Sequence, residues 1–173
     1  MFKIKDKKAF IFYFIMTIIL TDLGNGIKKL SYVPKIQDFF DGSLVSIMHV
    51  YNTGGAFSIL QNKTSFLIVL SIIKLDLIAY HVYREVEFSD KISLISLTLF
   101  SAGTLGNLVE RLLNGRVVDY FKLNLFDFPV FNAFDIMICT GIFIYTVFII
   151  LEIKAESKKA AKDFDEKNCN NEI

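Results

Sequence analysis

Residues 103–135 begin with Gly103-Thr-Leu-Gly-Asn-Leu-Val-Glu-Arg111, continue through Val117-Val-Asp-Tyr120 and end with Phe131-Asn-Ala-Phe-Asp135. An apolar run precedes this stretch and another follows it. Asp119 and Asp135, 16 positions apart (135 minus 119), therefore fall where one membrane helix ends and the next begins. An ionisable side chain at such a place is costly and indicates a functional site. The short loop between the two carboxylates allows them to face each other.

The composition is that of a membrane protein. Of the 173 residues, 53% are hydrophobic and the mean hydropathy is +0.47, which is too apolar for an ordinary soluble domain. The formal net charge of +1 gives no basic field that would favour nucleic acid. No CxxC, HExxH or paired-histidine motif predicts a metal site. We therefore expect neither a metal nor nucleic acid as a partner.

Four apolar segments predict transmembrane helices at about residues 9–27, 64–83, 92–110 and 134–151, since a span needs about 20 apolar residues. The expected fold is an all-α membrane protein with a transmembrane domain over residues 9–151. Residues 1–8 precede it, and a charged tail, residues 152–173, follows as a frayed helix or disorder. The first segment also resembles a cleaved signal peptide, but Thr21-Asp-Leu-Gly24 is a poor cleavage site and three more spans follow.

The orientation follows from the span count and the lysines. Four spans put both termini on one side, where lysines of the N-terminus and of the tail flank the spans. The positive-inside rule makes that side cytoplasmic. Residues 28–63 and 114–133 then face outward together with both carboxylates, and residues 44–51 add short β-structure to this outer region.

Besides Glu110 and Asp135 at the span ends, three charged residues lie inside the predicted spans. We interpret Lys74 as a snorkelling side chain and Asp76 as an interior-facing or interfacial residue, because positions two apart do not face each other on a helix. Asp22 lies in the outer third of the first span, and we expect it to face protein or water.

A polar stripe marks the outer end of the third span. Gly103, Asn107 and Arg111 are spaced four apart and share one helix face, with Glu110 beside them. The stripe runs toward the loop that bears Asp119. A helix-packing motif with polar contacts is the alternative, because small residues at 102 and 106 favour close helix approach.

Two further motifs each have a purely structural explanation. Asn132 is a strong N-cap residue, and Asp135 three positions later resembles a capping box. Residues 52–57, Asn-Thr-Gly-Gly-Ala-Phe, form a turn whose glycines also allow a ligand to approach the backbone. Capping explains neither the second acid, Asp119, nor its place at the same membrane face.

Two facing carboxylates are able to share one proton, because like charges at close range do not both ionise. One acts as a general base on water, and the protonated one donates to a carbonyl oxygen. The pair titrates as a unit. This chemistry needs no cofactor.

Taken together, the motifs resemble the lipoprotein signal peptidases, also called signal peptidase II. Residues 52–57 match the family's Asn-x-Gly-x-Ala-Phe box, and residues 106–111 match its Gly-Asn-x-x-Asp-Arg box with Glu110 in place of Asp. Residues 117–120 match Val-x-Asp-Phe with Tyr120 as the last residue, and residues 131–135 match Phe-Asn-x-Ala-Asp with Phe134 in place of Ala. In the first span the family has a lysine four residues after the aspartate, whereas Gly26 stands there and the nearest lysines are Lys28 and Lys29.

The resemblance covers about residues 9–151 and implies an aspartic endopeptidase of the bacterial cytoplasmic (inner) membrane. Such an enzyme removes the signal peptide of a prolipoprotein just before a diacylglyceryl-modified cysteine, so its partners are the acylated prolipoprotein and membrane lipid. Asp119 and Asp135 become the catalytic dyad. The residues that shape or support the site are Asp22, Asn52, Gly54, Asn107, Arg111 and Asn132.

Two other function classes stay open from the sequence. One is a non-enzymatic four-helix transporter or assembly subunit in which Asp22, Asp119 and Asp135 line an ion or proton path. The other is an adaptor that binds lipid or peptide in the same groove without cleaving it. Cleavage of an acylated precursor by the purified protein distinguishes the enzyme from both.

Overall fold

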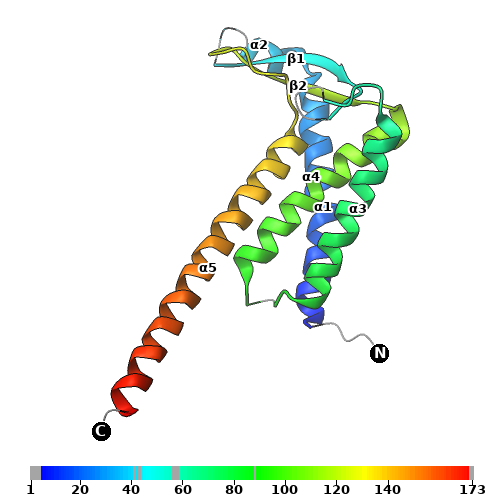
Figure 1. Cartoon of the computed structure of the whole chain (residues 1–173). Coiled ribbons are helices and arrows are strands. Elements are labelled where there is room, and N and C mark those ends of the chain that lie inside the picture. The colour runs from blue at the N-terminus through cyan, green and yellow to red at the C-terminus, as the bar shows by residue number, and fades with distance from the viewer. Residues whose placement is uncertain (1–4, 41, 43, 56–58, 88, 172–173) are drawn as a thin grey trace.

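The computed structural model describes residues 5–40, 42, 44–55, 59–87 and 89–171, and for residues 161–171 only the backbone. Long helices carry a small two-stranded sheet at the end of the molecule opposite both termini (Figure 1). The elements in chain order are α1 (Lys7–Ser31), α2 (Pro34–Phe40), β1 (Val45–Asn52), α3 (Thr64–Arg84), α4 (Lys91–Asn114), β2 (Val117–Leu123) and α5 (Ala133–Asn171).

Within the described residues, four helices are long and apolar enough to cross a membrane: α1, α3, α4 and the Ala133–Ala160 part of α5. The predicted fold class, four membrane helices with a small β-containing region, is confirmed. Helix α5 continues through the charged tail to Asn171. The short helix α2 lies where the sequence indicated only a loop.

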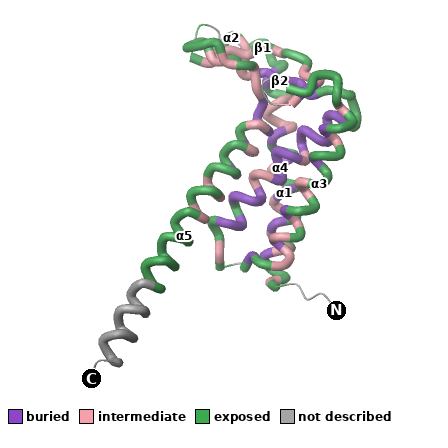
Figure 2. Tube along the Cα trace, viewed as in Figure 1, coloured by how far each residue is buried: buried purple, intermediate pink, exposed green. Residues whose placement is uncertain are grey.

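Helix α4 is the centre of the bundle, because α1, α3 and α5 all pack against it. Its buried face is made largely of small residues, and Ser96, Ser101 and Ala102 are fully buried. Figure 2 shows buried residues concentrated along α4, whereas α5 is mostly exposed. The outward faces of α1 and α3 carry exposed leucine, isoleucine and phenylalanine side chains, as expected of surfaces that meet lipid.

Phe134 fills the space at the junction of three helices. It lies at the start of α5, is fully buried and packs with Ala102 and Met137. A Cβ atom added at Gly24 of α1 or at Gly106 of α4 would overlap its ring. The two glycines therefore make room for the large side chain that stands here in place of alanine.

The helix ends are fixed by local hydrogen bonds. Asp6 accepts from the main-chain N–H groups of Lys8 and Ala9 at the start of α1, and Asp90 accepts from that of Ser93 at the start of α4. Gly115 ends α4 in the left-handed conformation with φ +69°, which glycine adopts without steric cost. This turn leads directly into β2.

Strands β1 and β2 pair antiparallel, with Val50 opposite Asp119 and Asn52 opposite Val117. The register shifts between Ile47 and Val50, which indicates a bulge or a similar irregularity. At the other edge of β2, an isolated bridge joins Phe121 to Phe131. The loop between β2 and α5 therefore folds back, and the start of α5 lies beside Asp119.

Candidate active site

The backbone brings the two ends of the loop between β2 and α5 together. The N–H groups of Tyr120 and Phe121 both donate to the Phe131 carbonyl, at 3.0 and 2.8 Å, and Phe131 donates back to Phe121 at 3.0 Å. The Tyr120 hydroxyl accepts the N–H of Ala133 at 3.2 Å. Asn132 is held next to β2 as a result, and Asp135 follows it in the first turn of α5.

Asp119 is buried, with 3% of its surface exposed, and each of its oxygens accepts a side-chain hydrogen bond. Asn132 Nδ2 donates to Oδ1 at 2.6 Å, and Asn52 Nδ2 donates to Oδ2 at 3.0 Å. Because Asn52 is two residues from Val50, the cross-strand neighbour of Asp119, both side chains lie on one face of the sheet.

Asp135 forms the capping box that the sequence indicated. Its Oδ2 accepts the N–H of Asn132 at 3.1 Å, and Asn132 Oδ1 accepts the N–H of Asp135 at 3.0 Å. The other oxygen, Oδ1, accepts from Asn107 Nδ2 at 2.9 Å. Capping therefore engages one carboxylate oxygen, while the second binds a residue of another helix.

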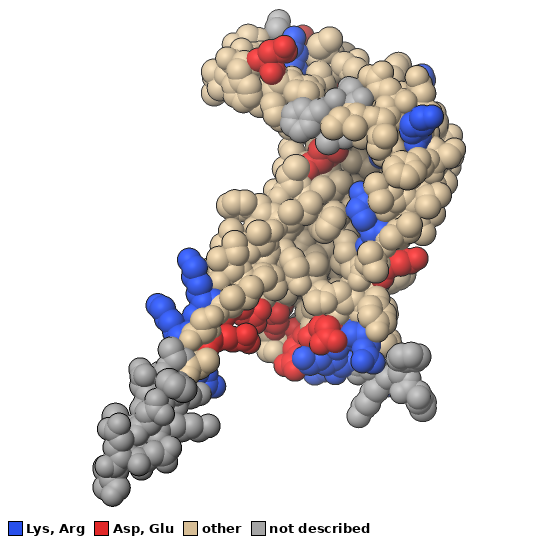
Figure 3. Space-filling view, viewed as in Figure 1, with Lys and Arg blue, Asp and Glu red and all other residues tan. Residues whose placement is uncertain are grey.

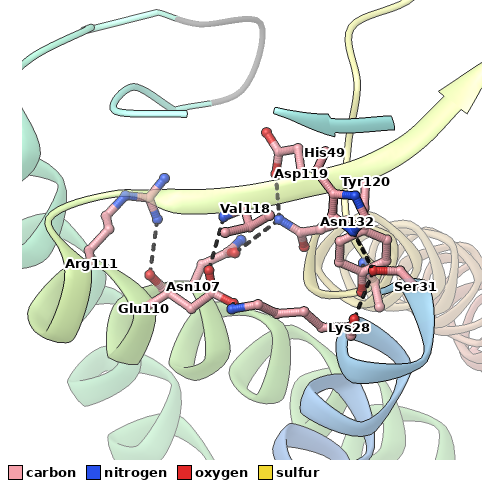
Figure 4. Close-up of polar contacts among 11 residues, drawn as sticks. Lys28, Ser31, His49, Asn107, Glu110, Arg111, Val118, Asp119, Tyr120 and Asn132 are labelled. Carbon is pink, nitrogen blue, oxygen red and sulfur yellow. Dashed lines mark hydrogen bonds and ion pairs between the residues drawn. The ribbon is translucent and has the colours of Figure 1, made fainter. Parts of the chain in front are cut away.

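Two asparagines connect the carboxylates. Asn132 Nδ2 donates both to Asp119 and, at 3.3 Å, to Asn107 Oδ1, and Asn107 in turn donates to Asp135. Figure 4 shows Asn107, Asp119 and Asn132 converging from α4, β2 and the start of α5. The carboxylates are thus held in one network whose amide donors match carboxylate acceptors.

Arg111 supports the turn that carries Asn52. Its Nη2 donates to the Gly54 carbonyl at 2.7 Å and its Nη1 to the Asn107 carbonyl at 3.3 Å. The N–H of Gly54 donates to Asn52 Oδ1 at 2.8 Å, which orients the amide toward Asp119. Gly54 thus acts through its backbone. Ala56 and Phe57, the last two residues of this motif, lie outside the described residues.

The charges around Asp119 oppose one another. Burial raises the pKa of Asp119 to about 6, and the negative charge of Asp135 adds to the rise. Hydrogen bonds from Asn52 and Asn132 and the positive charge of Arg111 lower it. A carboxyl group with this pKa exchanges its proton near neutral pH, as acid–base catalysis requires.

Both carboxylates line a cavity of about 850 Å³ under the sheet. It lies between α3 and α5, which both pack on α4. Its walls are mostly apolar and include Leu67, Leu70 and Ile138. Figure 3 shows this hollow beneath the sheet layer, with acidic and basic side chains inside it.

Lys74 and Asp76 lie on different faces of α3. Lys74 is half-buried and lines the cavity, whereas Asp76 is exposed on another face of the helix. Of the two interpretations given for Asp76, interior-facing or interfacial, the interior-facing one is therefore wrong. Lys74 is the charged residue of α3 that lines the cavity.

Asp22 does not join the cluster. It is exposed on α1 and does not line the cavity. The described residues also contain no group of three His, Cys, Asp or Glu side chains that could hold a metal ion.

The structure adds Lys28 and Glu110 to the neighbourhood of the site. Glu110 Oε1 forms an ion pair with Lys28 Nζ, and Oε2 accepts the N–H of Val118 at 2.9 Å, one residue before Asp119. Figure 4 shows this contact reaching from α1 to β2. The sequence signal was the position of Glu110 three residues after Asn107, but its acceptor role depends on the loop geometry.

The model of the family described as signal peptidase (SPase) II matches residues 15–151, which is most of the chain. The chain belongs to the signal peptidase II family. A lipoprotein signal peptidase of Enterococcus faecalis is 30% identical over 152 residues, which cover 86% of this chain and 93% of that protein. One of Caldicellulosiruptor bescii is 36% identical over 111 residues, 64% of this chain and 71% of that protein.

Solved structures share the fold. A bacterial membrane enzyme determined by the in meso method superimposes with a TM-score of 0.69 at 24% identity and covers 92% of this chain and 96% of that chain. Gly26 stands at the position where the motif compared in the sequence analysis has a lysine. Lys28, two positions further, supplies the cation that pairs with Glu110.

Proposed function

We propose that this protein is an aspartic endopeptidase that removes signal peptides from bacterial prolipoproteins, cutting just before a diacylglyceryl-modified cysteine. The observation that carries the proposal is a hydrogen-bond network around Asn132. Its side chain donates to Asp119 and accepts the N–H of Asp135, and both acids line one cavity. Membership of the signal peptidase II family supports the same activity.

In the proposed reaction the two carboxylates hold one proton between them. The ionised carboxylate removes a proton from a water molecule while the oxygen of that water attacks the scissile carbonyl carbon. The protonated carboxyl group donates its proton to the carbonyl oxygen. The tetrahedral intermediate then collapses. The C–N bond breaks, the nitrogen of the cysteine takes up a proton from the dyad, and a hydroxyl of the intermediate returns a proton to the dyad. The signal peptide leaves with a new carboxyl terminus.

The proposed orientation places the site at the outer face of the cytoplasmic membrane, with both termini in the cytoplasm. The termini lie at one end of the bundle and the sheet with β2 at the other (Figure 1). Lysines near the N-terminus and in the first part of the tail flank α1 and α5 at the end with the termini. At the outer face, a scissile bond next to the acyl-bearing cysteine would lie at the same level in the membrane as the dyad.

The transporter alternative receives less support from the geometry. An ion path through Asp22, Asp119 and Asp135 requires the three acids to line one route. Asp22 is exposed on α1 and takes no part in the cavity wall that the other two share.

The test compares an acylated and an unmodified precursor at equal concentration in the same bilayer. We expect the acylated form to be cut on the N-terminal side of its cysteine and the unmodified form to be cut very slowly. Each buried CH₂ contributes about 0.8 kcal/mol to anchoring, so the acyl chains hold the scissile bond at the level of the dyad. Absence of cleavage would refute the proposal, and equal rates would indicate a more general membrane protease.

A further inference from the structure

The mostly apolar wall that α3 gives to the cavity carries one cation, Lys74, that the proposed chemistry does not use. Leu67, Leu70, Ser71 and Lys74 line it from α3, at the spacing of one helix face. Lys74 is half-buried and Asp76, two positions on, is exposed on another face. Helix α3 therefore turns a lysine, and not its neighbouring acid, toward the site.

Lys74 lies below the dyad in the membrane. Thr64, the first residue of α3, donates to the carbonyl of Gly115 at 3.0 Å, which places it at the outer end of α4. Lys74 is ten residues further on (74 minus 64), so its backbone lies about 15 Å deeper along the helix. Helix side chains lean toward the N-terminus, which here is the outer end, and Arg111 is near enough for the two cations to interact.

Two donors on this side of the cavity have no acceptor among the described residues. Lys74 Nζ makes no hydrogen bond or ion pair there, and Arg111 Nε is buried without one. The acids have their own donors in Asn52, Asn107 and Asn132. A lysine held inside a span is costly, and such residues normally serve a function.

We propose that Lys74 binds main-chain carbonyl oxygens at the C-terminal end of the substrate's membrane helix. This inference rests on the proposed peptidase function, which brings a signal peptide into the cavity from the bilayer. The last four carbonyls of a helix lack intrahelical donors, and the negative end of the helix dipole attracts a cation. The carbonyl end of the helix, just before the scissile bond, reaches the depth of the lysine side chain.

Because this contact forms on binding and persists in the transition state, Lys74 governs affinity more than turnover. It is a positioning residue for the substrate. We expect Lys74→Met to raise KM about tenfold and to change kcat less than about twofold. Lys74→Arg, which keeps a cation, should restore KM to within about threefold of wild type, and Asp76→Asn on the exposed face should leave both constants unchanged.

The assay uses the full-length protein in bilayers with an acylated, fluorogenic precursor peptide, and the thermal transition of each variant checks folding. An unchanged KM in Lys74→Met, or a Lys74→Arg as weak as Lys74→Met, would overturn the inference. Ester carbonyls of the diacylglyceryl group are the other source of such acceptors. An ether-linked precursor separates the two, because loss of the Lys74→Met effect with it would assign the contact to the lipid and refute the helix-end site.

A binding measurement distinguishes this inference from the proposed function. In an Asp119→Asn background, which does not cleave, the dissociation constant of the acylated precursor should rise about tenfold on adding Lys74→Met. If wild type fails to cleave, the peptidase proposal fails whatever the binding result. If wild type cleaves and binding is insensitive to Lys74, only the present inference fails.

Discussion

Lys28 Nζ lies 2.5 Å from Glu110 Oε1, so an ion pair joins the C-terminal part of α1 to the C-terminal part of α4. The two side chains are 22% and 6% exposed. The second oxygen of Glu110 accepts the N–H of Val118, the residue before Asp119. Lys28 thereby stabilises the Glu110 carboxylate. That carboxylate holds β2, the strand that carries Asp119 of the proposed dyad.

Lys28→Met should therefore lower both stability and activity. It leaves the buried Glu110 carboxylate without its cation, and losing a hydrogen bond to a charged group costs about 1.5–3 kcal/mol. Thermal unfolding in detergent measures the effect. Lys29→Met, at the exposed neighbouring position, is the matched control and should behave as wild type.

The double variant Lys28→Met/Glu110→Gln gives the second readout. The neutral amide still accepts the Val118 N–H and needs no cation, so the double variant should be more stable than Lys28→Met alone. Additive losses would show that the two side chains act independently.

Asp119→Asn and Asp135→Asn should each reduce cleavage at least a hundredfold, the lower range for loss of an acid–base group. Neither carboxylate is able to replace the other in the proposed dyad. Product formation from the acylated precursor is the measurement, and Asp127→Asn in the exposed loop after β2 is the control. If Asp135 acted only as a cap, its loss would cost about 0.5–2 kcal/mol of stability and folded protein would stay active.

Local pattern was sufficient to predict the spans and the clustered motifs. The apolar runs located all four membrane helices, because span length is fixed by bilayer thickness. The four-residue spacing of Asn107 and Arg111 placed them on one helix face, where the structure has them. The Asn132–Asp135 capping box formed as its three-residue spacing indicates.

Contacts between distant segments were not predictable from one sequence. Strand β1 pairs with β2, which lies beyond α3 and α4 in the sequence, and the loop after β2 folds back to form a bridge at Phe131. The ion pair of Lys28 joins residues 82 positions apart. The orientation of α3 decides whether Lys74 or Asp76 meets the cavity, and a nearly uniformly apolar helix does not encode its rotation. The same holds for Asp22, which the packing of α1 leaves outside the site.

Phe134→Ala should destabilise the bundle by about 3–5 kcal/mol, because it empties the junction of α1, α4 and α5. Gly106→Ala alone should destabilise by about 1–3 kcal/mol, since its methyl group overlaps the ring. In the double variant the methyl group refills part of the space. Its loss, measured by thermal unfolding, should be smaller than the sum of the single losses, and strict additivity would contradict this packing.

Reporter fusions truncated after Asp38 and after Ser89 should report opposite sides of the membrane. Asp38 lies in α2 near the sheet, and Ser89 lies in the turn between α3 and α4 at the end with the termini. We expect an exported reporter to be active only at Asp38 and a cytoplasmic reporter only at Ser89. Finding both on one side would remove the proposed location of the site.

The last prediction concerns pH. The ordinary pKa of an aspartate is 3.8, and burial together with the charge of Asp135 raises the pKa of Asp119 to about 6. The dyad needs one proton, so kcat/KM should fall about tenfold per pH unit once the pH is well above 6.

Because the pKa of Asp119 is higher in the folded than in the unfolded protein, the stability contributed by this carboxyl group is present below about pH 3.8 and is lost as pH rises through 6. Between pH 7 and 8.5 that loss is complete, so the thermal transition should stay level with respect to this group while activity declines. Rates with the acylated peptide from pH 5 to 8.5 at constant ionic strength provide the measurement. A level rate across this range would contradict an essential proton on the pair.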